Sequence, residues 1–223
     1  MLNELALEKY QTWGGLHDKE TVEPSYIESW RGRLPESLLS FWSEIGIGSM
    51  ASQSLWLCKP EDYSEVLTVL FGADPQFSSK DCFVIAYDAF GKLYVWSERY
   101  QGVTIDLVVL TISSLSISKP HVGGSNDRAI WSIMNTVNDK DNLFDRLDQA
   151  GKYLYKRARK KLGPLAPGEV YGFVPALKFG GPNVLENLHR LSAQEHFSIL
   201  AQIDTPMLMN FSAWPAKVIR PVG

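Results

Sequence analysis

The sequence has few cysteines and no long apolar run. Among its 223 residues only Cys58 and Cys82 are cysteines, and their separation is not that of a metal-binding pair. So few thiols favour a reducing compartment, and we expect a cytoplasmic protein. No window approaches the ~18 consecutive apolar residues of a membrane span. Residues 1–13 carry Glu4, Glu8 and Lys9 in place of an apolar segment, so we also expect no secretory signal.

Recognisable catalytic motifs are missing as well. The sequence contains no nucleophile elbow, phosphate loop or zinc spacing. Residues 46–51 have the glycine spacing of a dinucleotide-binding turn, but that turn needs a preceding strand and a following helix, and the pattern predicts the reverse. We interpret them as a helix end and a loop. Glu186 and His189, with His196 beyond, supply one Glu-x-x-His pair, whereas a di-iron bundle needs two on long helices. We therefore expect no enzyme, no metal and no cofactor.

The charge is unevenly distributed along the chain. Residues 1–110 hold 16 acidic and 8 basic side chains, and residues 111–223 hold 9 acidic and 14 basic. The split either serves local solubility or gives an acidic N-terminal half that faces a cationic partner. Residues 152–161 interleave cations with two tyrosines, as nucleic-acid-binding segments do. Cations near the end of a helix also complement its dipole, so we expect no direct nucleic-acid binding.

Apolar periodicity and turn residues predict alternating helices and strands. The predicted helices are residues 2–13, 24–30, 35–45, 60–71, 126–137, 152–162 and 192–202. The predicted strands are residues 54–58, 83–88, 93–97, 103–111, 113–117, 169–174, 184–191 and 207–211, followed by a tail of about a dozen residues. Strands 83–88 and 93–97 are expected to form a hairpin.

A glycine-bearing break at residues 120–125, where the sign of the charge also changes, predicts a domain boundary at about residue 122. The expected fold class is α+β with two small domains. Residues 1–122 would combine N-terminal helices with an antiparallel meander. Residues 123–223 would mix helices and short strands and end in the tail.

Several segments carry a family resemblance. Residues 34–42 (LPESLLSFW), the loop 46–48 and residues 56–63 (WLCKPEDY) resemble the bacterial GAD-like domain. Residues 168–177 (GEVYGFVPAL), followed by Gly180-Gly181 and Glu195-His196, look like the domain that follows it. The pairing is similar to the Tdi-type immunity proteins of type VI secretion systems. The opening pattern of residues 34–42 also resembles the SMI/KNR-like immunity superfamily.

This resemblance implies a cytoplasmic protein that neutralises a cognate secreted DNase toxin by binding it, without catalysis and without a membrane. A nuclease site presents cationic groups to hold phosphates, so an acidic surface on the inhibitor would raise the rate of encounter. The candidate contacts, acidic residues and hairpin aromatics, are Glu61, Asp62, Glu65, Tyr87, Asp88, Trp96 and Glu98. The alternative from another class is a small-ligand or regulatory binding module at Gly180-Gly181.

Overall fold

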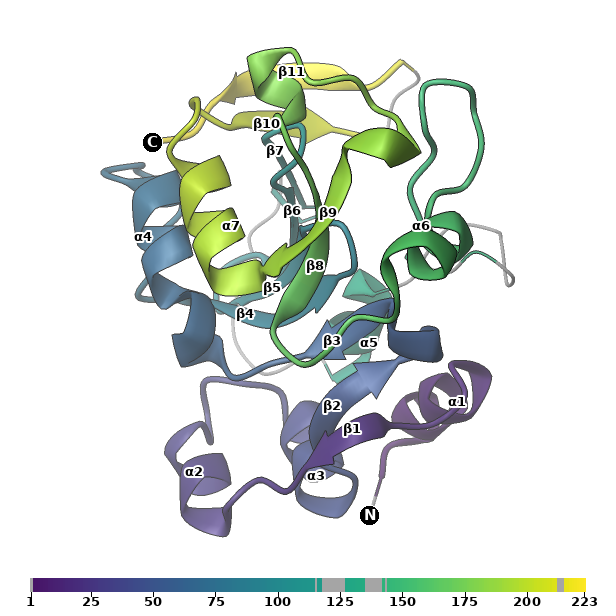
Figure 1. Ribbon diagram of the computed structural model, residues 1–223. Helices are drawn as coiled ribbons and strands as arrows, with labels where there is room; N and C mark the ends of the chain where they lie inside the picture. The colour runs from purple at the N-terminus through teal and green to yellow at the C-terminus, as the bar shows by residue number, and fades with distance from the viewer. Residues whose placement is uncertain (1, 115, 118–126, 135–141, 143, 212–214) are drawn as a thin grey trace.

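The computed structural model describes residues 2–114, 116–117, 127–134, 142, 144–211 and 215–223 (Figure 1). The helices are α1 (Glu4–Thr12), α2 (Pro24–Ser29), α3 (Glu36–Glu44), α4 (Ser64–Phe71), α5 (Asp127–Ile133), α6 (Tyr155–Leu162) and α7 (Ala193–Ala201), with short 3-10 turns η1 (Ala51–Gln53), η2 (Pro60–Tyr63), η3 (Leu177–Phe179) and η4 (Leu185–Asn187). The strands are β1 (His17–Glu20), β2 (Ile47–Met50), β3 (Leu55–Leu57), β4 (Cys82–Asp88), β5 (Lys92–Ser97), β6 (Gln101–Asp106), β7 (Thr111–Ser113), β8 (Glu169–Phe173), β9 (Leu188–Ser192), β10 (Met207–Asn210) and β11 (Lys217–Pro221).

Local signals start several helices where the sequence predicts them. The Asn3 side chain accepts hydrogen bonds from the backbone N–H groups of Leu5 and Ala6 and so caps α1. Pro24 occupies the first turn of α2, where its missing N–H is not needed. Ser192 accepts from the backbone N–H of Glu195 and so caps the start of α7.

Within the described residues, nine strands form one sheet in the order β1-β2-β3-β4-β5-β6-β7-β10-β11. Neighbouring strands are antiparallel except β7 and β10, which are parallel. The hairpin of β4 and β5 is confirmed, with Phe83 opposite Trp96 and Tyr87 opposite Leu93. Strands β8 and β9 form a separate pair that lies in front of the sheet in Figure 1. The fold is therefore mixed α and β, with a large and mostly antiparallel sheet at its centre.

Each face of the sheet carries its own core. Along β5, Leu93 and Val95 point to one face, and Tyr94 and Trp96 point to the other. The first core lies between the sheet and α4, α6, α7 and the β8–β9 pair. The second lies between the sheet and α1, α2, α3 and α5. Helices thus cover both faces of the sheet. The two cores hold most of the aromatic side chains in which the sequence is rich.

Three segments differ from the sequence-based expectation. Residues 47–50, predicted as loop, form β2 and are fully buried, so they lack the polar alternation that marks a half-exposed strand. The predicted loop around His17 forms β1, which pairs with β2. The described part of the predicted tail contains β11, which pairs with β10, and the following Val222 is buried in the first core.

The predicted boundary at residue 122 lies outside the described residues. Segments from both predicted domains contribute to one sheet, because β10 pairs with β7. They also share the first core, where Tyr63 and Tyr87 contact Phe197 of α7. The division at residue 122 stays a prediction, and the two parts are packed as one body. Over the ranges that the structure describes, no helix is long and apolar enough to cross a membrane.

Candidate functional site

Charged side chains gather where α2 meets η2. The Tyr26 hydroxyl of α2 donates a hydrogen bond to the Glu61 carboxylate. The Lys59 ammonium lies 5.8 Å from the centre of the Tyr26 ring and forms an ion pair with Glu20 of β1. This hydrogen bond with Glu20 raises the pKa of Lys59. The half-buried Tyr26 ring therefore contacts Lys59 and Glu61, and Glu20 pairs with the same Lys59.

A second charged group lies just beyond the C-terminal end of α2. The rings of Tyr26 and Trp30 lie 6.4 Å apart, and the Arg33 guanidinium lies 5.7 Å from the Trp30 ring. Arg33 donates to the Glu98 carboxylate at 2.9 Å and stacks over Phe83. Contacts through α2 thus connect Glu61 with Glu98, which are far apart in the sequence. We call the outer side chains of this region the α2 surface, and we include in it the neighbouring Asp62 of η2 and Glu65 of α4. Its members are Glu20, Tyr26, Arg33, Lys59, Glu61, Asp62, Glu65 and Glu98.

The α2 surface is acidic. It holds five carboxylates against the two cations Lys59 and Arg33. Desolvation raises the pKa of Asp62, and Lys59 partly offsets this effect. Across the described residues, no group of three or more His, Cys, Asp or Glu side chains is placed to hold a metal ion. The surface can attract and hydrogen-bond a cationic partner, since its carboxylates are exposed.

Three of the seven predicted contact residues are buried. The Tyr87 ring packs between Tyr63 and Phe197 in the first core. The Asp88 carboxylate accepts hydrogen bonds from the backbone N–H groups of Phe90 and Lys92 and so orders the turn between β4 and β5. Desolvation raises the pKa of Asp88 to about 6.

Trp96 is the third buried residue, and its indole N–H donates to the backbone carbonyl of Arg33 at 3.1 Å. These three side chains hold the fold together and present no surface to a partner. The exposed members of the predicted set are Glu61, Asp62, Glu65 and Glu98. Tyr26 and Lys59 are not among the contacts predicted from the sequence, although Tyr26 stands in a predicted helix within a segment rich in acidic residues.

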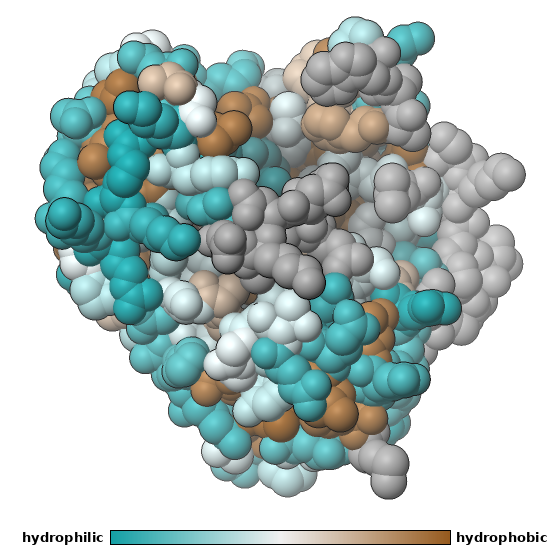
Figure 2. Space-filling view, turned by 90° about the vertical axis from the view of Figure 1, so that its right-hand side faces the viewer, coloured by the Kyte–Doolittle hydropathy of each residue, from teal (hydrophilic) through white to brown (hydrophobic). Residues whose placement is uncertain are grey.

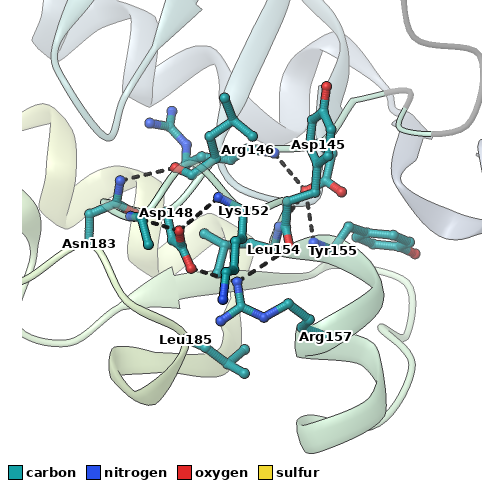
Figure 3. Close-up of polar contacts among 12 residues, drawn as sticks. Asp145, Arg146, Asp148, Lys152, Leu154, Tyr155, Arg157, Asn183 and Leu185 are labelled. Atoms are coloured by element: carbon teal, nitrogen blue, oxygen red, sulfur yellow. Dashed lines mark hydrogen bonds and ion pairs between the residues drawn. The ribbon is translucent and has the colours of Figure 1, made fainter.

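A polar network fixes the N-terminus of α6 (Figure 3). The Asp145 carboxylate accepts from the backbone N–H groups of Arg146, Leu154 and Tyr155, although desolvation raises its pKa. The Asp148 carboxylate accepts from the Lys152 N–H and from the Arg157 guanidinium, which lowers its pKa. Part of the basic segment 152–161 therefore has a structural role within the fold.

The other face of α6 holds η1 in place. The Tyr155 hydroxyl and the Arg159 guanidinium both donate to the Ser52 carbonyl, at 2.6 and 2.7 Å. Ala51, Ser52 and Gln53 all have a positive φ, a conformation that costs non-glycine residues roughly 1 kcal/mol or more each. The contacts from α6 stabilise this turn. Figure 2 shows the face that includes this region, where hydrophilic side chains predominate and apolar ones lie in small separate groups.

The remaining sequence candidates also serve the fold. His196 is buried beneath Gly172, and desolvation lowers its pKa, which favours the neutral imidazole. Gly180 ends η3 in a left-handed conformation. A Cβ on Gly181 would lie 2.0 Å from the Pro175 carbonyl oxygen, so this position requires glycine. The Gly180-Gly181 pair is thus explained by a tight turn.

Comparison with known proteins agrees with the resemblance seen in the sequence. Residues 3–110 match the family model of the GAD-like domain. Residues 135–204 match the model described as T6SS immunity protein Tdi1, C-terminal. The chain therefore joins a GAD-like domain to a Tdi1-type C-terminal region, in that order.

One solved structure is similar over nearly the whole chain. The crystal structure of Atu4351 from Agrobacterium tumefaciens aligns with a TM-score of 0.86 and 24% identity, covering 99% of this chain and 97% of the other. This likeness supports the fold, with the two matched regions in a common arrangement. No curated protein sequence matches the chain.

Proposed function

We propose that this protein is a cytoplasmic immunity protein that binds a cognate type VI secretion DNase toxin and neutralises it by contact, without catalysis. The observation that carries the proposal is the match of residues 135–204 to the C-terminal region of a T6SS immunity protein. The preceding GAD-like match and the absence of a metal-binding cluster among the described residues are consistent with a binding role. The coarser inference, an immunity-type protein, rests directly on these matches.

The α2 surface is the proposed contact with the toxin. A nuclease that holds phosphates presents cationic side chains, and the five exposed carboxylates of the α2 surface would complement them. Tyr26 supplies a half-buried aromatic ring among charged neighbours, which is the composition typical of interface hot spots. We narrow the predicted contact set to Glu61, Asp62, Glu65 and Glu98, because Tyr87, Asp88 and Trp96 are buried.

The proposal predicts that a neighbouring gene encodes a secreted nuclease toxin, and the first test is co-purification with that nuclease. The two proteins are co-expressed and purified through a tag on one of them, first in low salt. The proposal predicts a stable complex and protection of plasmid DNA from degradation by the toxin. Failure to form a complex in low salt would contradict the proposed function.

The second test locates the contact. The double variant Glu61→Lys and Glu65→Lys reverses two charges of the α2 surface, and Glu8→Lys with Glu186→Lys reverses two exposed charges elsewhere. We expect the first variant to slow association about tenfold or more in low salt, with a smaller difference in high salt, because steering is screened. The control variant should bind as the wild type does. Equal loss in both variants would refute the assignment of the surface, while leaving the immunity function intact.

A further inference from the structure

A cavity of about 460 Å³ lies between α5 and the sheet, on the face opposite the first core. Gly102 and Thr104 of β6 form its floor, and Ala129 and Ile133 of α5 form its roof. Met209 of β10 closes one wall. The volume lies within the range of about 300–1,000 Å³ of small-molecule sites. No residue that lines the cavity belongs to the α2 surface, and the proposed toxin contact does not use the cavity.

The shape of the cavity follows from β6. Gln101, Gly102, Thr104 and Asp106 line it, and the six residues of this strand extend about 17 Å at roughly 3.4 Å per residue. Gly102 allows α5 to come close, since a Cβ at this position would lie 2.5 Å from the Ile133 side chain. The cavity is therefore elongated, with Gln101 at one end and Asp106 at the other.

One end of the cavity has a buried donor without an acceptor. Gln101 is 7% exposed, and its Nε2 has no hydrogen-bond partner among the described residues. Its backbone also has a φ of 57°, which disfavours a glutamine. Buried amide groups are nearly always hydrogen-bonded, because leaving one unpaired costs roughly 1–3 kcal/mol. An unpaired amide at a strained position beside a cavity could donate to a ligand that carries an acceptor.

The hydroxyl groups at the same end add further donors. Ser116 lines the cavity near Gln101, because the antiparallel register of β6 and β7 places Thr104 opposite Ser113. The Thr104 and Ser113 hydroxyls lie 2.7 Å apart and bond to each other. An oxygen-rich group of a ligand would satisfy Gln101 and accept from a serine hydroxyl at this end.

The charged groups of the cavity gather at the end formed by Asp106. Among the described lining residues, Asp106 is the one carboxylate, and Arg146 already neutralises it through an ion pair in which both side chains are 17% exposed. Lys92 lies opposite Asp106 in the register of β5 and β6, and it adds a cation at the same end of the cavity. Lys92 and Arg146 together exceed Asp106 by one positive charge, so the charged groups around the cavity do not repel an anion.

We propose that this cavity binds a small organic carboxylate with an apolar body. The carboxylate accepts from Gln101 Nε2 and from the neighbouring serine hydroxyls. The apolar body lies along Gly102 between Ile133 and Met209. The site is separate from the α2 surface, so its occupancy is measured without the toxin.

The test ligand is 4-phenylbutyrate. The control ligand is 4-phenylbutan-1-ol, which has the same apolar body but a hydroxyl in place of the carboxylate. Both are titrated against the full chain by NMR saturation transfer. We expect the carboxylate to bind about tenfold or more tightly than the alcohol, as a hydrogen bond to a charged group predicts. Gln101→Met keeps the length of the side chain but removes the amide, and it should abolish this preference.

A cavity-filling variant tests the location. Ser132→Trp places a large ring at the exposed edge of α5 that lines the cavity, and it should abolish binding of both probes. Ser198→Trp on α7 is the matched control, because each serine hydroxyl donates to the carbonyl four residues earlier in its helix. Circular dichroism checks that each variant is folded. Equal affinity for the two probes, no binding of either, or unchanged binding in Gln101→Met or Ser132→Trp would overturn the proposal.

Discussion

The ion pair of Arg220 and Asp74 fastens β11 to the loop that follows α4, and its removal gives a quantitative prediction. The guanidinium donates two hydrogen bonds to the Asp74 carboxylate, one of them 2.9 Å long, and the Asp74 side chain is 1% exposed. Desolvation raises the pKa of Asp74, but the bonds from Arg220 and from backbone N–H groups outweigh it and lower the pKa from 3.8 to about 2.

The magnitude follows from this shift. A fall from 3.8 to about 2 corresponds to about 2.4 kcal/mol of stabilisation by all the partners of the carboxylate. Gln76 and Phe77 supply backbone donors that stay in place when Arg220 is replaced. We therefore expect Arg220→Met to lower the free energy of unfolding by about 2 kcal/mol, which is below the usual 3–5 kcal/mol for a broken buried pair.

Urea denaturation followed by tryptophan fluorescence measures this loss. Lys217→Met is the matched control, since Lys217 lies exposed on the same strand, and it should change stability by less than about 0.5 kcal/mol. A cycle with Asp74→Ala and the double variant should give a coupling energy of about 2 kcal/mol. Additive losses, or a loss in Arg220→Met no larger than in the control, would refute the reasoning. The stabilisation is present above pH 4 and is lost as the pH falls through 2, because the folded-state pKa is depressed.

Three further predictions concern the C-terminal region. Gly172→Ala should lower the free energy of unfolding by about 1–3 kcal/mol, measured in urea, because the new Cβ would lie 2.5 Å from His196 Nε2; unchanged stability would contradict the tight contact. The lowered pKa of His196 means that its neutral form stabilises the fold fully above pH 6.5, and that this contribution is lost as the pH falls below that value. His196→Gln should therefore reduce the difference between the urea midpoints at pH 7.5 and pH 5, and an unchanged difference would count against this role. Tyr155→Phe should cost about 1 kcal/mol through loss of the bond to the Ser52 carbonyl, and an unaltered thermal midpoint would exclude it.

Local chemistry made many elements predictable. Helix starts at Pro24 and Ser192 follow from a fixed φ and from a side-chain cap, and both depend only on neighbouring residues. The β4–β5 hairpin follows from two apolar runs around a short turn. By contrast, β2 is buried on both faces, and β11 has an exposed pattern that resembles a tail. These two segments are strands because they pair with other strands of the sheet, and their local sequence patterns do not predict that pairing.

The features of the candidate site also divide into those that the sequence determines and those that depend on tertiary packing. The sequence by itself determined the acidic balance of residues 1–110, the positions of Glu61, Asp62 and Glu65 near a helix start, and the motifs of the GAD-like and Tdi1-type regions. Only the tertiary structure decided which carboxylates are exposed, because burial depends on what packs against each residue. It placed Tyr87 and Trp96 in the cores and brought Tyr26, Lys59 and Glu61 together. The cavity beside Gln101 likewise exists only after α5 packs over β6, since residues distant in the sequence line it.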